Sequence, residues 1–209
     1  MDPEQSSHFL ALVAGNLYET QTSGTSWQGL PDEAPDGLVL FAMHPLDSRT
    51  LFAVNEGPDS VLLKSQDGGR SWTMHELQEG FMAHPYDFLE GDKSTGKILY
   101  ASGEVLDEEP PFDVGTYVTL DGGDTWARIG LEDSCTALGI HPEEPLSAIC
   151  ATKGGLLRKT IDGGQTWQEL ARPPAGRIHR VVFDAMDPET LWVGGLGLFI
   201  STDGGVSWE

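Results

Sequence analysis

The apolar residues of this chain fall into short runs that alternate with Gly, Pro, Asp and Ser. Representative runs are residues 38–43, 135–140 and 178–183. Runs of this length, bounded by turn-forming residues, predict β-strands. No segment shows a sustained helical period, so the pattern predicts an all-β protein.

Groups of about four runs recur along the chain and define five units of one predicted domain, 1–209. The units cover about 1–30, 31–79, 80–130, 131–171 and 172–209. The predicted strands are 9–15, 16–22 and 27–30; 38–43, 50–54, 60–65 and 72–77; 135–140, 147–152, 156–160 and 167–170; and 178–183, 190–193 and 198–202. The first unit lacks an innermost strand and the fifth an outermost one. The longer third unit carries two insertions, 90–97 and 104–115, which are loop-like in composition.

One octapeptide, Ser/Thr-x-Asp-x-Gly-x-Ser/Thr-Trp, joins the last two runs of a unit. Its Asp can accept hydrogen bonds from the backbone N–H groups that follow, and its Gly allows the positive φ of a tight turn. The residues assigned to this structural role are Ser65, Asp67, Gly69 and Trp72; Thr119, Asp121, Gly123 and Trp126; Thr160, Asp162, Gly164 and Trp167; and Ser201, Asp203, Gly205 and Trp208. A degenerate fifth copy, 20–27, has Thr22 at the Asp position.

The octapeptide is identified as the Asp box, or bacterial neuraminidase repeat, and the chain resembles the sialidase-like β-propeller superfamily. The box tryptophans lie about 40 to 55 residues apart, the length of a four-stranded blade. The resemblance implies a β-propeller of four-stranded antiparallel blades. Two architectures stay open: a closed ring of five units with three-stranded end blades, and part of a propeller with six or more blades.

Activity does not follow from this resemblance, because the superfamily includes sialidases, xyloglucanases, sortilin-type receptors and a photosystem II assembly factor. Sialidases would need a Tyr nucleophile and three arginines that grip the substrate carboxylate. Arg177-Ile-His179 departs at its last residue from the sialidase segment Arg-Ile-Pro. Arg70 and Arg128 lie in or just after boxes, which the family places away from the active site.

His-Pro pairs occur at 44–45, 84–85 and 141–142, and Asp184 takes the matching place in the fifth unit. Imidazole and carboxylate groups of this kind are the ligands that a metal site would use. Equivalent positions on neighbouring blades are too far apart to share one ion. We interpret these pairs as strand-ending turns, since Pro has no N–H to continue a ladder. The sequence shows no phosphate-binding Gly loop and no zinc spacing, so no metal or cofactor is expected.

The formal net charge is −21, with 12 Lys and Arg against 33 Asp and Glu. Such a surface repels phosphate backbones and anionic membranes, which excludes nucleic acid and membrane partners from the expectation. Self-association is expected if the ring is open. The two cysteines, Cys135 and Cys150, fall on neighbouring predicted strands, and we expect buried free thiols, with a disulfide as the alternative.

We expect a non-catalytic scaffold that binds a protein or carbohydrate ligand through loops opposite the boxes, where loops on a rigid frame usually carry function. The candidate binding residues are Glu104, Asp107, Glu108, Glu109, Asp113, Lys153, Arg172 and Arg177. The alternative is a glycoside hydrolase fragment with catalytic residues outside this chain. The acidic N-terminus reads as lacking a secretory signal, so we expect a cytoplasmic protein, or an exported one if the N-terminus is incomplete.

Overall fold

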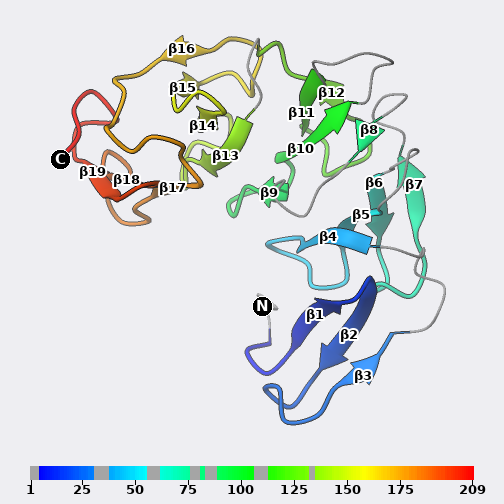
Figure 1. Cartoon of the computed structure of the whole chain (residues 1–209). Coiled ribbons are helices and arrows are strands. Elements are labelled where there is room, and N and C mark those ends of the chain that lie inside the picture. The colour runs from blue at the N-terminus through cyan, green and yellow to red at the C-terminus, as the bar shows by residue number, and fades with distance from the viewer. Residues whose placement is uncertain are drawn as a thin grey trace. The chain divides into compact units, whose positions relative to one another are not determined.

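The structure is a computed structural model, and it describes residues 5–30, 38–55, 62–75, 81–82, 89–105, 113–131 and 135–209. These residues form antiparallel sheets that follow one another along the chain (Figure 1). They contain no helix that is long and apolar enough to cross a bilayer. The all-β fold predicted from the sequence is therefore confirmed.

Five sheets, numbered here in chain order, correspond to the five predicted units. The first contains β1 (Phe9–Val13), β2 (Asn16–Thr20) and β3 (Gln28–Gly29). The second contains β4 (Leu38–Met43), β5 (Leu51–Asn55), β6 (Leu62–Ser65) and β7 (Thr73–His75). The third contains β8 (Phe81–Met82), β9 (Leu89–Gly91), β10 (Leu99–Val105), β11 (Asp113–Thr119) and β12 (Ala127–Arg128). The fourth contains β13 (Cys135–Ile140), β14 (Ala148–Thr152), β15 (Leu157–Thr160) and β16 (Gln168–Glu169), and the fifth β17 (Arg180–Phe183), β18 (Leu191–Gly194) and β19 (Leu198–Ser201).

The third sheet corrects the prediction of two loop insertions. Residues 89–91 form β9, which pairs with β10 at Leu99, Tyr100 and Ala101. Glu104 lies in β10 opposite Met82, and Asp113 begins β11. The predicted loops 90–97 and 104–115 are thus partly strand, because pairing with a partner strand outweighs their polar composition.

The described contacts group the chain into two units, 1–85 with 103–113 and 86–102 with 114–209. In the first unit, the core cluster consists of Leu17, Leu38, Ala53 and Leu63, with Leu12, Leu30 and Trp72 packed against it. The described residues of the second unit form two core clusters. The predicted single domain stays a prediction.

Each core cluster of the second unit fills the space on one side of the fourth sheet. On one side Leu138, Ala148 and Cys150 pack with Tyr100 of the third sheet and with Ile129, which directly follows β12. On the other side lie Ala137, Ile149, Ala151 and Leu157, together with Val181, Leu191 and Val193 of the fifth sheet. Side chains alternate between the two faces along β14, as the period of a β-strand requires.

Cys135 and Cys150 form a disulfide with an S–S distance of 2.06 Å, and this corrects the expectation of free thiols. The register of β13 against β14 shifts between Cys135 and Ala137. Cys135 therefore lies opposite Thr152 while sharing a core cluster with Cys150. The two cysteines thus lie on adjacent strands of one hairpin. The register shift in β13 that accompanies their disulfide is not visible in the sequence pattern.

Candidate functional site

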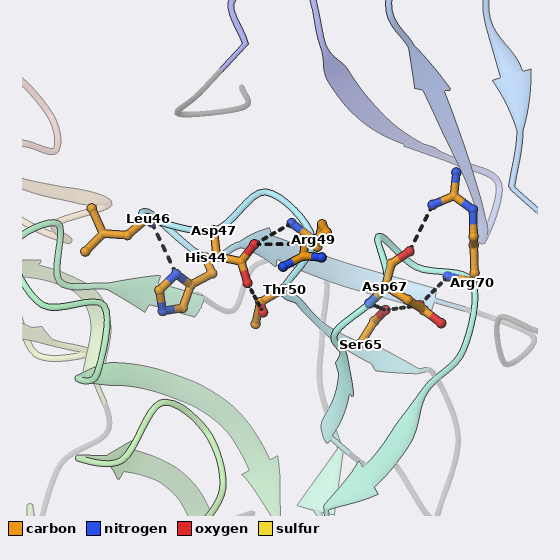
Figure 2. A network of polar contacts seen from close by, with 8 residues as sticks. All are labelled: His44, Leu46, Asp47, Arg49, Thr50, Ser65, Asp67 and Arg70. Carbon is orange, nitrogen blue, oxygen red and sulfur yellow. Dashed lines mark hydrogen bonds and ion pairs between the residues drawn. The ribbon is translucent and has the colours of Figure 1, made fainter.

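The Asp box forms a closed hydrogen-bond network at one end of each sheet. In the second sheet the Ser65 hydroxyl donates to Oδ1 of Asp67 at 2.9 Å (Figure 2). The Gly69 N–H donates to the Ser65 hydroxyl oxygen at 2.8 Å. Oδ1 of Asp67 also accepts from the N–H of Ser71, whose hydroxyl donates to Oδ2 at 2.6 Å. Both oxygens of this carboxylate thus accept hydrogen bonds from within the turn.

These hydrogen bonds lower the pKa of the box carboxylates. The Ser71, Thr166 and Ser207 hydroxyls are the largest cause for Asp67, Asp162 and Asp203 respectively, and each of these three carboxyl groups has a pKa of about 2. The pKa of Asp121 is shifted in the same direction by Thr125. The box aspartates are consequently ionised and locally satisfied at neutral pH, which is a structural role.

The degenerate first box keeps the same turn with a weaker acceptor. The Ser26 N–H donates to the Thr22 hydroxyl oxygen at 2.9 Å, and the Gly24 N–H donates to the Thr20 hydroxyl oxygen at 3.1 Å. Ser23 adopts a φ of 54°, in the left-handed region that favours glycine. A hydroxyl therefore replaces the carboxylate without loss of the hairpin.

A second turn lies at the same end of each sheet and is tied to the box. The Gly68 N–H donates to the Arg49 carbonyl at 2.8 Å, and the Gly163 N–H donates to the Leu146 carbonyl at 2.9 Å. Nδ1 of His44 accepts the Leu46 N–H in this turn (Figure 2). Nδ1 of His141 accepts the N–H groups of Glu143 and Glu144, and Oδ1 of Asp184 accepts those of Met186 and Asp187.

These contacts give His44 and His141 a turn-capping role. His84 lies outside the described residues. Within the described part of the chain, no group of three His, Cys, Asp or Glu side chains could hold a metal ion. The Asp residue that organises the corresponding turn of the third sheet, Asp92, was missed by sequence reasoning. It is 1% exposed and accepts the N–H groups of Ser94, Thr95 and Ile98.

Three loops meet at the end of the fourth and fifth sheets that lies opposite the boxes, and two of them carry the predicted binding residues Lys153, Arg172 and Arg177. They are 153–155, between β14 and β15; 171–177, between β16 and β17; and 194–197, which starts with the last residue of β18 and leads into β19. Nη2 of Arg172 donates to the Gly154 carbonyl at 2.6 Å, and the Leu196 N–H donates to the Ala175 carbonyl at 2.8 Å. We call these three segments the loop cluster.

Glycine makes the close packing of the loop cluster possible. A Cβ atom added to Gly155, which has a φ of +75°, would lie 2.3 Å from the Gly176 carbonyl oxygen. A Cβ atom on Gly195 would lie 2.4 Å from the Ala175 carbonyl oxygen. By contrast, a Cβ atom on Gly154 would meet nothing closer than 3.8 Å. The loops therefore form a fixed surface on which Lys153, Arg172 and Arg177 are exposed.

The other predicted binding residues are not brought to this surface by any described contact. Asp107, Glu108 and Glu109 lie outside the described residues. Glu104 and Asp113 lie in the paired strands β10 and β11, and nothing is described of their side chains. Their assignment to a binding face stays a prediction.

A pocket of about 220 Å³ lies among β9, β13 and β17 in the second unit. Its polar lining includes Glu90, Lys93, His141 and Arg180. Oε1 of Glu90 lies 3.8 Å from Nη1 of Arg180, and burial raises the pKa of Glu90, while Arg180 and Lys93 oppose that rise. Glu90 is the one acidic residue lining this pocket in the described part of the chain, whereas two-carboxylate glycoside hydrolysis needs a pair.

The tyrosines are placed for packing. Tyr100 and Tyr117 are 0% and 1% exposed, and burial raises the pKa of Tyr100 further above its usual value of 10.0. The arginines are spread over local contacts. Nη1 of Arg70 donates to the Asp67 carbonyl, and Nη2 of Arg158 lies 3.5 Å from Oε2 of Glu169. The described arginines and tyrosines thus show no sialidase-type constellation.

A family model described as BNR/Asp-box repeat matches residues 199–209. The solved GH74 enzyme of Niastella koreensis has the same fold, with a TM-score of 0.78 and 19% identity over 100% of this chain and 37% of that one. The chain thus carries an Asp-box repeat and has the β-propeller fold. Ycf48 from Cyanidioschyzon merolae also shares the propeller fold, with a TM-score of 0.62 and 15% identity over 93% of this chain and 65% of that one.

Curated relatives of this Asp-box propeller are named for assembly or sorting. The photosystem II assembly lipoprotein Ycf48 of Synechococcus sp. (strain CC9902) is 29% identical over 164 residues, which are 73% of this chain and 42% of that protein. The vacuolar protein sorting/targeting protein 10 of Laccaria bicolor is 31% identical over 91 residues, 42% of this chain and 6% of that protein. The propeller thus spans less than half the length of these relatives.

Proposed function

We propose that this Asp-box propeller is a non-catalytic scaffold that binds a protein ligand, and that the loop cluster is part of its binding face. The observation that carries the proposal is the fixed contact among three loops from two sheets, which leaves basic side chains exposed. Loops held on a rigid frame are common binding surfaces. The names of the curated relatives, an assembly protein and a sorting/targeting protein, support a scaffold.

Charge favours an acidic ligand segment at the loop cluster. Residues 145–161 and 170–183 contain no Asp or Glu, although the chain as a whole carries a formal charge of −21. Lys153, Arg172 and Arg177 therefore form a basic region on an acidic molecule. A carboxylate-bearing segment is attracted there and repelled from most of the remaining surface, which favours one docking position.

A charge-reversal experiment tests this face. The probe is a fluorescently labelled peptide library that contains acidic and neutral sequences, with binding measured by fluorescence anisotropy. Lys153→Glu combined with Arg177→Glu should weaken the binding of acidic peptides by about tenfold or more, since two charge contacts are reversed. Lys97→Glu is the matched control, because Lys97 is exposed at the box end of the third sheet.

Two glycine variants test whether the fixed geometry matters. Gly155→Ala should also weaken binding, because its Cβ would collide with the Gly176 carbonyl and separate the loops, whereas Gly154→Ala should bind as the wild type does. Equal affinity of all variants for the acidic peptides would contradict the proposed face.

The hydrolase alternative is tested directly by turnover. We expect no release of fluorophore from a sialoside and no cleavage of xyloglucan by the purified chain. Tyr100 and Tyr117 are sealed from solvent, and the pocket at Glu90 offers one carboxylate. Turnover above the blank that is abolished by Glu90→Gln would contradict the scaffold proposal and would show that the protein is an enzyme.

A further inference from the structure

The pocket at Glu90 is formed by three strands of the second unit that are distant in the sequence. Strand β13 packs against both β9 and β17 (Figure 1). A Cβ atom on Gly139 of β13 would lie 2.9 Å from the Val181 carbonyl oxygen, so β17 lies directly beside this position. Every described residue that lines the pocket belongs to the second unit. The pocket is therefore a feature of one unit.

One part of the pocket wall is apolar. Leu138 and Val181 are 4% and 5% exposed, and Ile140 and Phe183 also line the pocket. The His141 ring packs edge-on against the Phe183 ring, with 5.3 Å between the ring centroids. Since Nδ1 of His141 accepts backbone N–H groups in its turn, the neutral ring carries its proton on Nε2. No described residue accepts a hydrogen bond from Nε2, so His141 has one N–H donor left for a ligand.

The other part of the wall contains a carboxylate whose hydrogen-bonding capacity the described chain does not use. Asp92, two residues beyond Glu90, accepts hydrogen bonds from three backbone N–H groups of its own turn. The Glu90 carboxylate accepts no hydrogen bond from a described residue. Its ion pair with Nη1 of Arg180 spans 3.8 Å, beyond hydrogen-bond distance. A half-buried carboxylate in this situation gains most from a donor that a ligand brings.

Two cations lie close to the Glu90 carboxylate. Burial raises the pKa of Glu90, and the positive charges of Arg180 and Lys93 act against this rise. The Arg180 side chain is 77% exposed, so its guanidinium can turn toward a bound carboxylate, for which its planar donors are well suited. The pocket thus presents an acceptor for a cationic group beside donors for an anionic one. A ligand with a single charge would satisfy only one of these two features.

We propose that the pocket binds a free α-amino acid with an apolar side chain. The ammonium group donates to Glu90, and the carboxylate accepts from Arg180 and Lys93. The side chain packs against Ile140 and Phe183. The pocket volume of about 220 Å³ lies below the roughly 300 Å³ at which pockets for drug-sized ligands begin, which suits a ligand of this size. None of these residues belongs to the loop cluster, so the inference is independent of the protein ligand proposed there.

Three small probes that differ by one charged group test this assignment on the whole chain by isothermal titration calorimetry. They are leucine, isocaproate, which is leucine without its ammonium group, and isoamylamine, which is leucine without its carboxylate. Leucine should bind at least about tenfold more tightly than either analogue, because each analogue loses a charge-assisted hydrogen bond. A wild-type protein that does not bind leucine in the millimolar range, or that binds isocaproate equally well, would overturn the proposal.

Two variants assign the charged contacts. Glu90→Gln should weaken leucine binding by about tenfold without weakening isocaproate binding, because only the ammonium group loses its partner. Arg180→Gln should weaken the binding of both probes, since both carry a carboxylate. The matched controls are Glu169→Gln and Arg158→Gln, which remove the same charges from an ion pair of the fourth sheet outside the pocket. Both controls should bind leucine as the wild type does.

Folding and the loop cluster are checked in the same variants. Circular dichroism should show the wild-type β-sheet signal for Glu90→Gln, because this carboxylate accepts no hydrogen bond from a described residue. The acidic peptides that probe the loop cluster should bind Glu90→Gln as they bind the wild type. Failure of those peptides to bind the wild type would contradict only the loop cluster. Leucine binding that persists unchanged in Glu90→Gln would place the amino acid elsewhere and overturn the inference.

Discussion

At the scale of single residues, the hydrogen bonds accepted by the box aspartate hold a hairpin closed and leave its carboxylate unavailable for other chemistry. Oδ1 of Asp162 accepts the Thr166 N–H and the Thr160 hydroxyl, and Oδ2 accepts the Thr166 hydroxyl at 2.6 Å. These donors favour the ionised form, so the pKa lies at about 2 instead of 3.8. A carboxylate committed in this way is a poor general acid or metal ligand, although it is solvent-accessible.

The lowered pKa values predict acid sensitivity. Since the folded-state pKa is below the unfolded one, the stabilising contribution is complete above pH 3.8 and is lost as the pH falls to about 2. The melting temperature of the wild type, followed by circular dichroism, should therefore fall steeply between these pH values. Asp162→Asn should melt lower at pH 7 and show a smaller acid-dependent fall, and identical acid profiles would contradict this account.

At the scale of elements, regular strands and boxes could be predicted from the sequence because their signals are local. Short apolar runs bounded by turn-forming residues identify β13 and β14, and the octapeptide identifies each hairpin end. Strand β9 could not be predicted, because Glu90-Gly91 reads as a loop and becomes strand through pairing with β10. The candidate site could not be predicted for the same reason, because its contact between Arg172 and Gly154 joins segments that are 18 residues apart in the sequence.

The disulfide is the element-scale feature with the largest expected effect on stability. It joins β13 and β14 across a sequence separation of 15, for which loop-closure entropy predicts a stabilisation of about 3 kcal/mol. Reduction should therefore lower the denaturant midpoint of the wild type. The Cys135→Ala and Cys150→Ala double variant should be equally destabilised and indifferent to reductant. Alkylation of both cysteines in the native, unreduced protein would contradict the disulfide.

At the scale of the whole molecule, the excess of negative charge acts on every part of the fold. A net charge of −21 destabilises the folded state by self-repulsion. Salt shortens the range of this repulsion from roughly 30 Å at 0.01 M to about 3 Å at 1 M. The melting temperature at pH 7 should consequently rise over this interval. At a pH near the isoelectric point of about 4.4, the same salt step should have little effect, and an equal rise there would argue against repulsion.

The last box differs from the others in where its indole N–H goes. In the second, third and fourth boxes the Trp indole donates to its own box glycine, at 3.0 to 3.3 Å. Nε1 of Trp208 instead donates to the Ala171 carbonyl, 37 residues earlier. This hydrogen bond connects the last hairpin to the segment that follows β16, the outermost strand of the preceding blade. Opening of the two blades should therefore be cooperative, and their slowest amide protons should exchange together.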